Sequence, residues 1–175
     1  MRTIICVMLT LAFAPGLAAA DVLNVAPSQV VILPSDGSGV TRIAVQFDLS
    51  GMLAGEGRVI DQAVLDWTPS GLRTGGRWEF SAYAVTEAWS EESVTAGWAP
   101  AMAEDPAAEW NLAPADDAVD GGGLIRFNLK DLVATWEAGT VATNGLVLVM
   151  DDVEALRLVG QLSNMRLIVY YGFRR

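Results

Sequence analysis

The sequence predicts an all-β fold, an antiparallel sandwich carrying one short helix near residues 129–138. Three observations lead to this fold class: short β-prone runs recur along the chain, Gly and Pro separate them, and one segment alone changes to helical spacing. The chain has 175 residues with 17 Gly and 7 Pro, and 52% of its residues are apolar. This length predicts one domain with a core of its own.

The first 20 residues are typical of an export signal. Arg2 supplies positive charge, residues 4–13 form a short apolar run, and Ala18-Ala19-Ala20 ends it with small side chains. The run is shorter than the roughly 20 apolar residues that a transmembrane helix needs. We therefore expect cleavage before Asp21, with an uncleaved anchor as the alternative. The mature chain, residues 21–175, is expected to be one secreted or periplasmic domain.

Eight short runs have the composition and spacing of strands. They cover residues 29–33, 42–49, 63–67, 78–82, 124–127, 144–150, 156–159 and 165–171. The second run alternates, which places Ile43, Val45 and Phe47 on one predicted inner face. The run at 144–150 is apolar on both faces and therefore predicts a central strand.

One segment has the period of a helix with a single buried stripe. Its apolar residues are Leu129, Leu132, Val133 and Trp136. Asn128 is the predicted N-cap, and Gly139 is placed to end the helix. Residues 99–123 are rich in Pro, Gly and Asp, so we expect a long loop there.

The runs carry motifs in a specific order. These are Phe47-Asp48-Leu49-Ser50, Ala63-Val64-Leu65, the stretch from Val85 to Glu91, Val94-Thr95, Phe127-Asn128-Leu129, Asn144-Gly145-Leu146 and the closing strand from Arg166 to Tyr170. Over residues 42–171 this order resembles the DNRLRE family of secreted modules. The resemblance implies a jelly-roll sandwich related to carbohydrate-binding modules, which are usually attached to, or act beside, enzymes and surface proteins that handle extracellular polysaccharide.

The six tryptophans are the main candidate ligand contacts, because sugar sites use exposed aromatic faces against pyranose rings. A sandwich core also needs large side chains. Trp67 and Trp136 lie on predicted inner stripes and Trp89 precedes a bend, so we interpret all three as structural. Trp98 and Trp110 border the predicted loop, where burial is harder to arrange, and we expect them to form a shallow sugar platform.

Three further residues complete the predicted ligand site. Trp78, which follows a Gly-rich run, is a weaker aromatic candidate, and Arg77 and Asp120 are expected to hydrogen-bond sugar hydroxyls. Loss of Arg2 with the signal leaves 10 basic against 21 acidic residues, a formal charge of −11. This charge argues against nucleic acid and predicts a neutral glycan, although excess acid also simply favours solubility.

Cofactor chemistry is restricted by composition. The single cysteine, Cys6, lies in the predicted signal, and without His the chain lacks Ser-His-Asp triads, Cys-His nucleophiles and His-containing zinc sites. Two acidic groups could offer oxygen ligands to calcium: Asp116, Asp117 and Asp120, and then Asp151, Asp152 and Glu154. Neither has EF-hand spacing, so we expect no cofactor, with a structural Ca²⁺ as the alternative.

Catalysis would need paired carboxylates, for which Glu87, Glu91 and Glu92 are the nearest candidates. No pattern places two of them across a cleft, so we expect a non-catalytic carbohydrate-binding or surface-associated module. A structural or adhesive module that contacts secreted or surface proteins is the second hypothesis. A carboxylate-dependent polysaccharide-degrading enzyme is the third.

Overall fold

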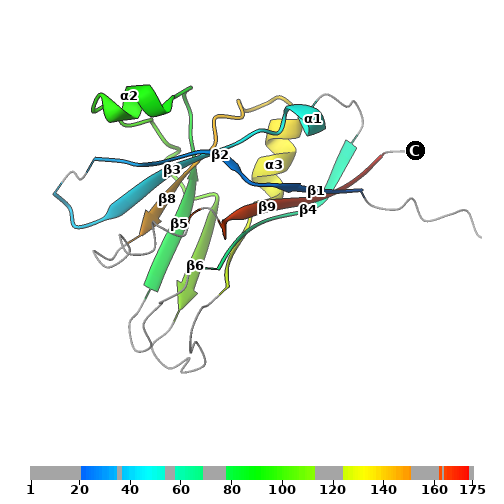
Figure 1. Ribbon diagram of the computed structural model, residues 1–175. Coiled ribbons are helices and arrows are strands. Elements are labelled where there is room, and N and C mark those ends of the chain that lie inside the picture. The colour runs from blue at the N-terminus through cyan, green and yellow to red at the C-terminus, as the bar shows by residue number, and fades with distance from the viewer. Residues whose placement is uncertain are drawn as a thin grey trace, which may run out of the picture.

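The structure is a computed structural model that describes residues 21–34, 37–53, 58–68, 78–112, 124–150, 162 and 164–173. Its strands are β1 (Asp21–Val25), β2 (Pro27–Ile32), β3 (Thr41–Phe47), β4 (Arg58–Trp67), β5 (Trp78–Ala84), β6 (Ala108–Leu112), β7 (Ile125–Asn128), β8 (Leu146–Met150) and β9 (Arg166–Phe173) (Figure 1). Its helices are α1 (Ser50–Leu53), α2 (Glu91–Thr95) and α3 (Lys130–Glu137). The predicted signal at 1–20 and the predicted strand at 156–159 lie outside the described residues.

The strands form two antiparallel sheets, of order β1-β9-β4-β7 and β2-β3-β8-β5-β6. On one side the chain passes from the first sheet to the second between β1 and β2, with only Ala26 between the two strands. On the other side β6 contacts β7, so the two sheets also meet there. The predicted all-β sandwich is therefore confirmed, while the jelly-roll path implied by the family resemblance stays a prediction.

The core lies between the inner faces of the two sheets. Ile43 and Phe47 face inward from β3, and Leu65 and Trp67 face them from β4, all at most 4% exposed. Phe80 on β5 meets the Trp67 ring edge-on at 6.1 Å between centroids. Each such side chain contributes about 1.5–3 kcal/mol by leaving water. The inner faces predicted from alternation are therefore confirmed.

Strand β8 is central, as its two apolar faces predict, because it pairs with β3 on one side and β5 on the other. Leu148 faces the main core, whereas Val147 on the opposite face is covered by Trp89 and by Val94 of α2. Helix α2 thus packs on the outer face of the five-stranded sheet. It seals a second, smaller apolar cluster there.

Helix α3 follows the predicted stripe. Val133 and Trp136 are buried against the core. The N-cap residue is Leu129 and not the predicted Asn128, whose carboxamide oxygen accepts a hydrogen bond from the Lys130 backbone N–H at 3.1 Å. Gly139 ends the helix with φ of 68°, a left-handed conformation that suits glycine. The helix was predicted at residues 129–138, and the structure confirms it within one residue at each end.

Three parts of the fold differ from the sequence prediction. Strand β1 was not predicted, and β6 lies inside residues 99–123, which were expected to be a loop. Both contain Asn and an acidic residue, which are poor strand formers, and pairing with β9 and β5 overrides that propensity. Helices α1 and α2 are also additional to the single predicted helix, because four or five residues are too few to display a helical period.

Candidate functional site

Trp98 lies directly after α2 on a tightly bonded turn. A reciprocal pair of hydrogen bonds between Ser90 and Ser93 forms a capping box at the start of α2. At its end, Gly97 adopts φ of 93° and the Trp98 backbone N–H donates to the Ser93 carbonyl oxygen at 3.2 Å. The Trp98 side chain is 36% exposed. The other five tryptophans of the chain are buried or half-buried.

The residues after Trp98 are fixed to the end of β5. Ala101 accepts a backbone hydrogen bond from Thr86 at 2.9 Å, and its own N–H donates to the Glu87 carboxylate at 2.9 Å. Met102 then forms an isolated antiparallel β-bridge with Val85. Residues 96–102, which we name the α2 ledge, are thus anchored at both ends. They hold the backbone that carries the exposed Trp98 indole in a defined place.

Trp110 and Trp78, the other two aromatic candidates, pack around Phe80. Trp110 is half-buried and meets the Phe80 ring at 5.4 Å between centroids. Trp78 is 4% exposed and stacks almost parallel to Phe80 at 6.1 Å. Strand alternation therefore turns Trp78 into the core, which leaves little of its ring for the predicted ligand contact.

The predicted platform of Trp98 and Trp110 is not formed. Trp110 pairs with Phe80 at one end of β5, whereas the α2 ledge is attached at Val85 beyond the other end. Five residues of extended strand span about 17 Å. Figure 1 shows α2 at one end of β5 while β6 runs toward the opposite end. The platform required two exposed indole rings, and of the two only Trp98 is exposed.

The remaining predicted contacts lie outside the described residues. Arg77 and Asp120 fall there, as do both acidic groups considered for calcium. Across the described ranges, no group of three or more acidic, Cys or His side chains is arranged to hold a metal ion. The same ranges contain no helix that is long and apolar enough to cross a bilayer.

The three candidate carboxylates lie on or beside α2. The Glu87 carboxylate accepts a hydrogen bond from the Ala101 backbone N–H. Glu91 and Glu92 occupy the first turn of α2, where negative side chains interact favourably with the helix dipole. All three are exposed. The hydrogen bond to Ala101 and the first turn of α2 thus account for the positions of these three carboxylates.

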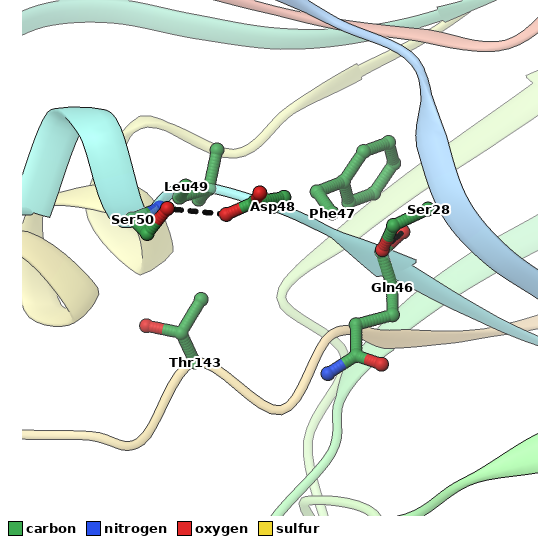
Figure 2. Close-up of a pocket in the computed structure, with 7 residues that line it drawn as sticks. All are labelled: Ser28, Gln46, Phe47, Asp48, Leu49, Ser50 and Thr143. Atoms are coloured by element: carbon green, nitrogen blue, oxygen red, sulfur yellow. Dashed lines mark hydrogen bonds between the residues drawn. The ribbon is translucent and has the colours of Figure 1, made fainter.

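A surface hollow of about 370 Å³ lies where β3 ends and α1 begins (Figure 2). Gln46 and Ser28 form one side, the corner from Phe47 to Ser50 forms another, and Thr143 on the loop before β8 completes it. Five of the seven lining residues have polar side chains. The Phe47 and Leu49 side chains themselves are buried, so they support the wall from below.

Among the described residues that line this hollow, Asp48 alone carries a charge. Its carboxylate accepts hydrogen bonds from the Ser50 hydroxyl and from the Ser50 backbone N–H, and these bonds lower the pKa of Asp48 below its ordinary value. The group is therefore ionised at neutral pH. On the opposite side, the Ser28 hydroxyl donates to the Gln46 carbonyl oxygen at 3.1 Å.

Sequence reasoning did not identify this hollow. Gln46 and Asp48 read as ordinary outward-facing residues of a strand, and Ser28 and Thr143 belong to no pattern. The Phe47-Asp48-Leu49-Ser50 motif was the one available signal. Neither a scan against models of known protein families nor a search of curated proteins finds a match to this chain.

Proposed function

We propose that the mature chain is an exported, non-catalytic module that binds a neutral glycan, with Trp98 as its central contact. The observation that carries this proposal is the exposure of one indole on an anchored turn, while the other five tryptophans pack in or against the interior. A flat aromatic face covers the apolar C–H face of a sugar ring. A contact held in place before binding loses little conformational entropy.

Charge along the segment that carries Trp98 supports a neutral ligand. From Trp78 to Leu112 the chain contains seven acidic and no basic residues. Exposed carboxylates such as Glu91 can accept hydrogen bonds from sugar hydroxyls, but they repel uronic acids and sulfated sugars. The same charge disfavours nucleic acid as a partner.

A binding role accounts for the acidic side chains better than catalysis does. Glycosidases place two carboxyl groups on opposite sides of the scissile bond, about 5–10 Å apart. Glu87 instead fixes the α2 ledge, and Glu91 and Glu92 open to solvent from one turn of helix. The resemblance to DNRLRE modules, with its implied jelly roll and its setting beside polysaccharide enzymes, agrees with this role.

Location follows from the first 20 residues. Their charge, apolar run and small terminal residues support export to the periplasm or beyond the cell. Mass spectrometry of the purified protein should find Asp21 at the N-terminus. An N-terminus at Met1 would contradict cleavage.

Protein interaction is the second candidate function, supported by exposed apolar residues at one end of the β1-β9 pair. Val22 is 55% exposed and Phe173 is 53% exposed. The Arg58 guanidinium lies over the Phe173 ring, 5.8 Å from its centroid. Stable assembly in size measurements across a range of concentrations would favour this function.

The test of glycan binding is affinity measurement on a panel of soluble and insoluble neutral polysaccharides, followed by tryptophan fluorescence. For any glycan bound, we expect Trp98→Ala to weaken affinity about fivefold to thirtyfold, since stacking on an exposed ring contributes about 1–2 kcal/mol. Trp110→Phe is the matched control and should bind as tightly as the unaltered protein. Absence of binding across the panel, or full affinity of Trp98→Ala, would overturn the proposal.

A further inference from the structure

We infer that the hollow beside Asp48 is a second carbohydrate subsite that takes one neutral, polyhydroxylated sugar ring. This inference rests on the proposed glycan-binding function but concerns a different place on the molecule. The hollow is built from the end of β3, the start of α1, β2 and the loop before β8 (Figure 2). The α2 ledge contributes none of its lining residues.

The size and the chemistry of the hollow fit a small polar ligand. Its volume of about 370 Å³ lies at the lower end of the range for ligand pockets. The lining offers hydroxyl, amide and carboxylate groups: Ser28, Gln46, Asp48, Ser50 and Thr143. Vicinal hydroxyls of a sugar both donate and accept hydrogen bonds, so they can pair with all three kinds of group.

Two of these side chains are available to a ligand. Among the described residues, neither the Gln46 amide nor the Thr143 hydroxyl forms a hydrogen bond within the protein. Ser28 and Ser50 are engaged, with the Gln46 carbonyl oxygen and the Asp48 carboxylate respectively. The engaged pairs hold the walls, whereas Gln46, Thr143 and the remaining lone pairs of the Asp48 carboxylate are left to recognise the ring.

The wall that carries Thr143 is fixed by close packing. The Trp89 indole N–H donates to the Asn144 carbonyl oxygen at 2.7 Å. Gly145 adopts φ of 89°, and a Cβ at this position would overlap the Val45 carbonyl oxygen. The loop therefore approaches β3 as closely as only glycine allows. A hollow with both walls held in this way needs little rearrangement to accept a ligand.

The negative charge of Asp48 favours a neutral sugar over an anionic one as the ligand of the hollow. Asp48 is ionised at neutral pH, and no basic residue is found among the described residues that line the hollow. An anionic sugar would place its carboxylate or sulfate beside Asp48 without a compensating cation. A neutral ring instead donates hydroxyl hydrogens to the carboxylate, which is a strong type of hydrogen bond.

The experiment titrates the mature protein with methyl glycosides of glucose, mannose, galactose and xylose while backbone and side-chain amide NMR signals are recorded. For at least one glycoside, we expect shifts that concentrate at Gln46, Asp48, Ser50 and Thr143. Gln46→Leu and Thr143→Val should each weaken that binding about threefold to tenfold, the effect of losing one net hydrogen bond. Gln62→Leu removes an exposed amide from the outer face of β4 and should leave the affinity unchanged.

The outcomes separate this inference from the proposed function. If Trp98→Ala weakens polysaccharide binding as expected, while no glycoside shifts the NMR signals of the hollow at concentrations up to the solubility limit of that glycoside, the subsite is refuted and the module remains a glycan binder through Trp98. If glycosides shift the hollow and Trp98→Ala binds polysaccharide normally, the subsite stands and the role of Trp98 is refuted. Absence of both responses would overturn both. The shifts of the unaltered protein decide the question even if a variant fails to fold.

Discussion

Trp98 and Trp110 lie twelve residues apart in the sequence, yet Trp98 is exposed and Trp110 packs against the core. Trp110 joins β6, where the register with β5 brings its ring onto Phe80 and the core. Trp98 follows a helix of only five residues, and its turn is closed by backbone and serine hydrogen bonds. An aromatic side chain near a loop becomes structural when a strand fixes its direction inward. It stays exposed when local polar bonds fix the backbone instead.

The largest difference is expected in stability. Trp110→Ala should lower the free energy of unfolding by about 2 kcal/mol, because it leaves space beside Phe80, although a half-buried site costs less than a fully buried one. Trp98→Ala should change it by less than about 0.5 kcal/mol, since surface substitutions rarely do more. Urea denaturation of both variants measures this. Equal losses would show that the two rings do not differ as described.

A smaller effect is expected from the capping box that shapes the α2 ledge. Ser90→Ala removes the hydroxyl that accepts from the Ser93 N–H and should destabilise α2 by about 1 kcal/mol. Amide hydrogen exchange at Gly97 and Trp98 should become faster. Ser90→Thr, which retains a capping hydroxyl, is the control and should keep most of the protection. An unchanged exchange rate in Ser90→Ala would mean that the capping box does not stabilise the α2 ledge.

The smallest effect concerns the titration of Asp48 at the hollow. Its pKa is lowered in the folded chain, chiefly by the Ser50 hydroxyl. The resulting contribution to stability is therefore present above the pKa of the unfolded chain and is lost as the pH falls through the lowered folded value. Ser50→Ala should move the Asp48 midpoint back toward its ordinary value in a carbon-13 NMR titration. Identical midpoints in both proteins would contradict the hydroxyl bond.

The parts of the fold that the sequence predicted are those with strong local periodicity. The alternation through Ile43 and Phe47 and the stripe through Val133 and Trp136 each specify an inner face without knowledge of any partner. Strand β6 was missed because its residues lack strand propensity, and only pairing with β5 makes it a strand. Pairing register depends on contacts distant in sequence.

The candidate sites show the same limit. Exposure of Trp98 was predicted because it borders a loop, but its separation from Trp110 depends on where β6 pairs along β5. The hollow joins Ser28, Asp48 and Thr143 from three distant segments. No periodicity connects such residues. The motif from Phe47 to Ser50 marks this corner in the sequence, but it does not indicate that Ser28 and Thr143 lie opposite it.

The most direct test of the account observes all six indole N–H groups at once. The mature protein is titrated with a neutral polysaccharide fragment that it binds, and the indole signals are assigned from single Trp→Phe variants. We predict that the Trp98 signal shifts in proportion to binding, while the signals of Trp67, Trp110 and Trp136 stay in place. Shifts at Trp110 with none at Trp98 would contradict the account, because they would locate the ligand at the aromatic cluster around Phe80 rather than on the α2 ledge.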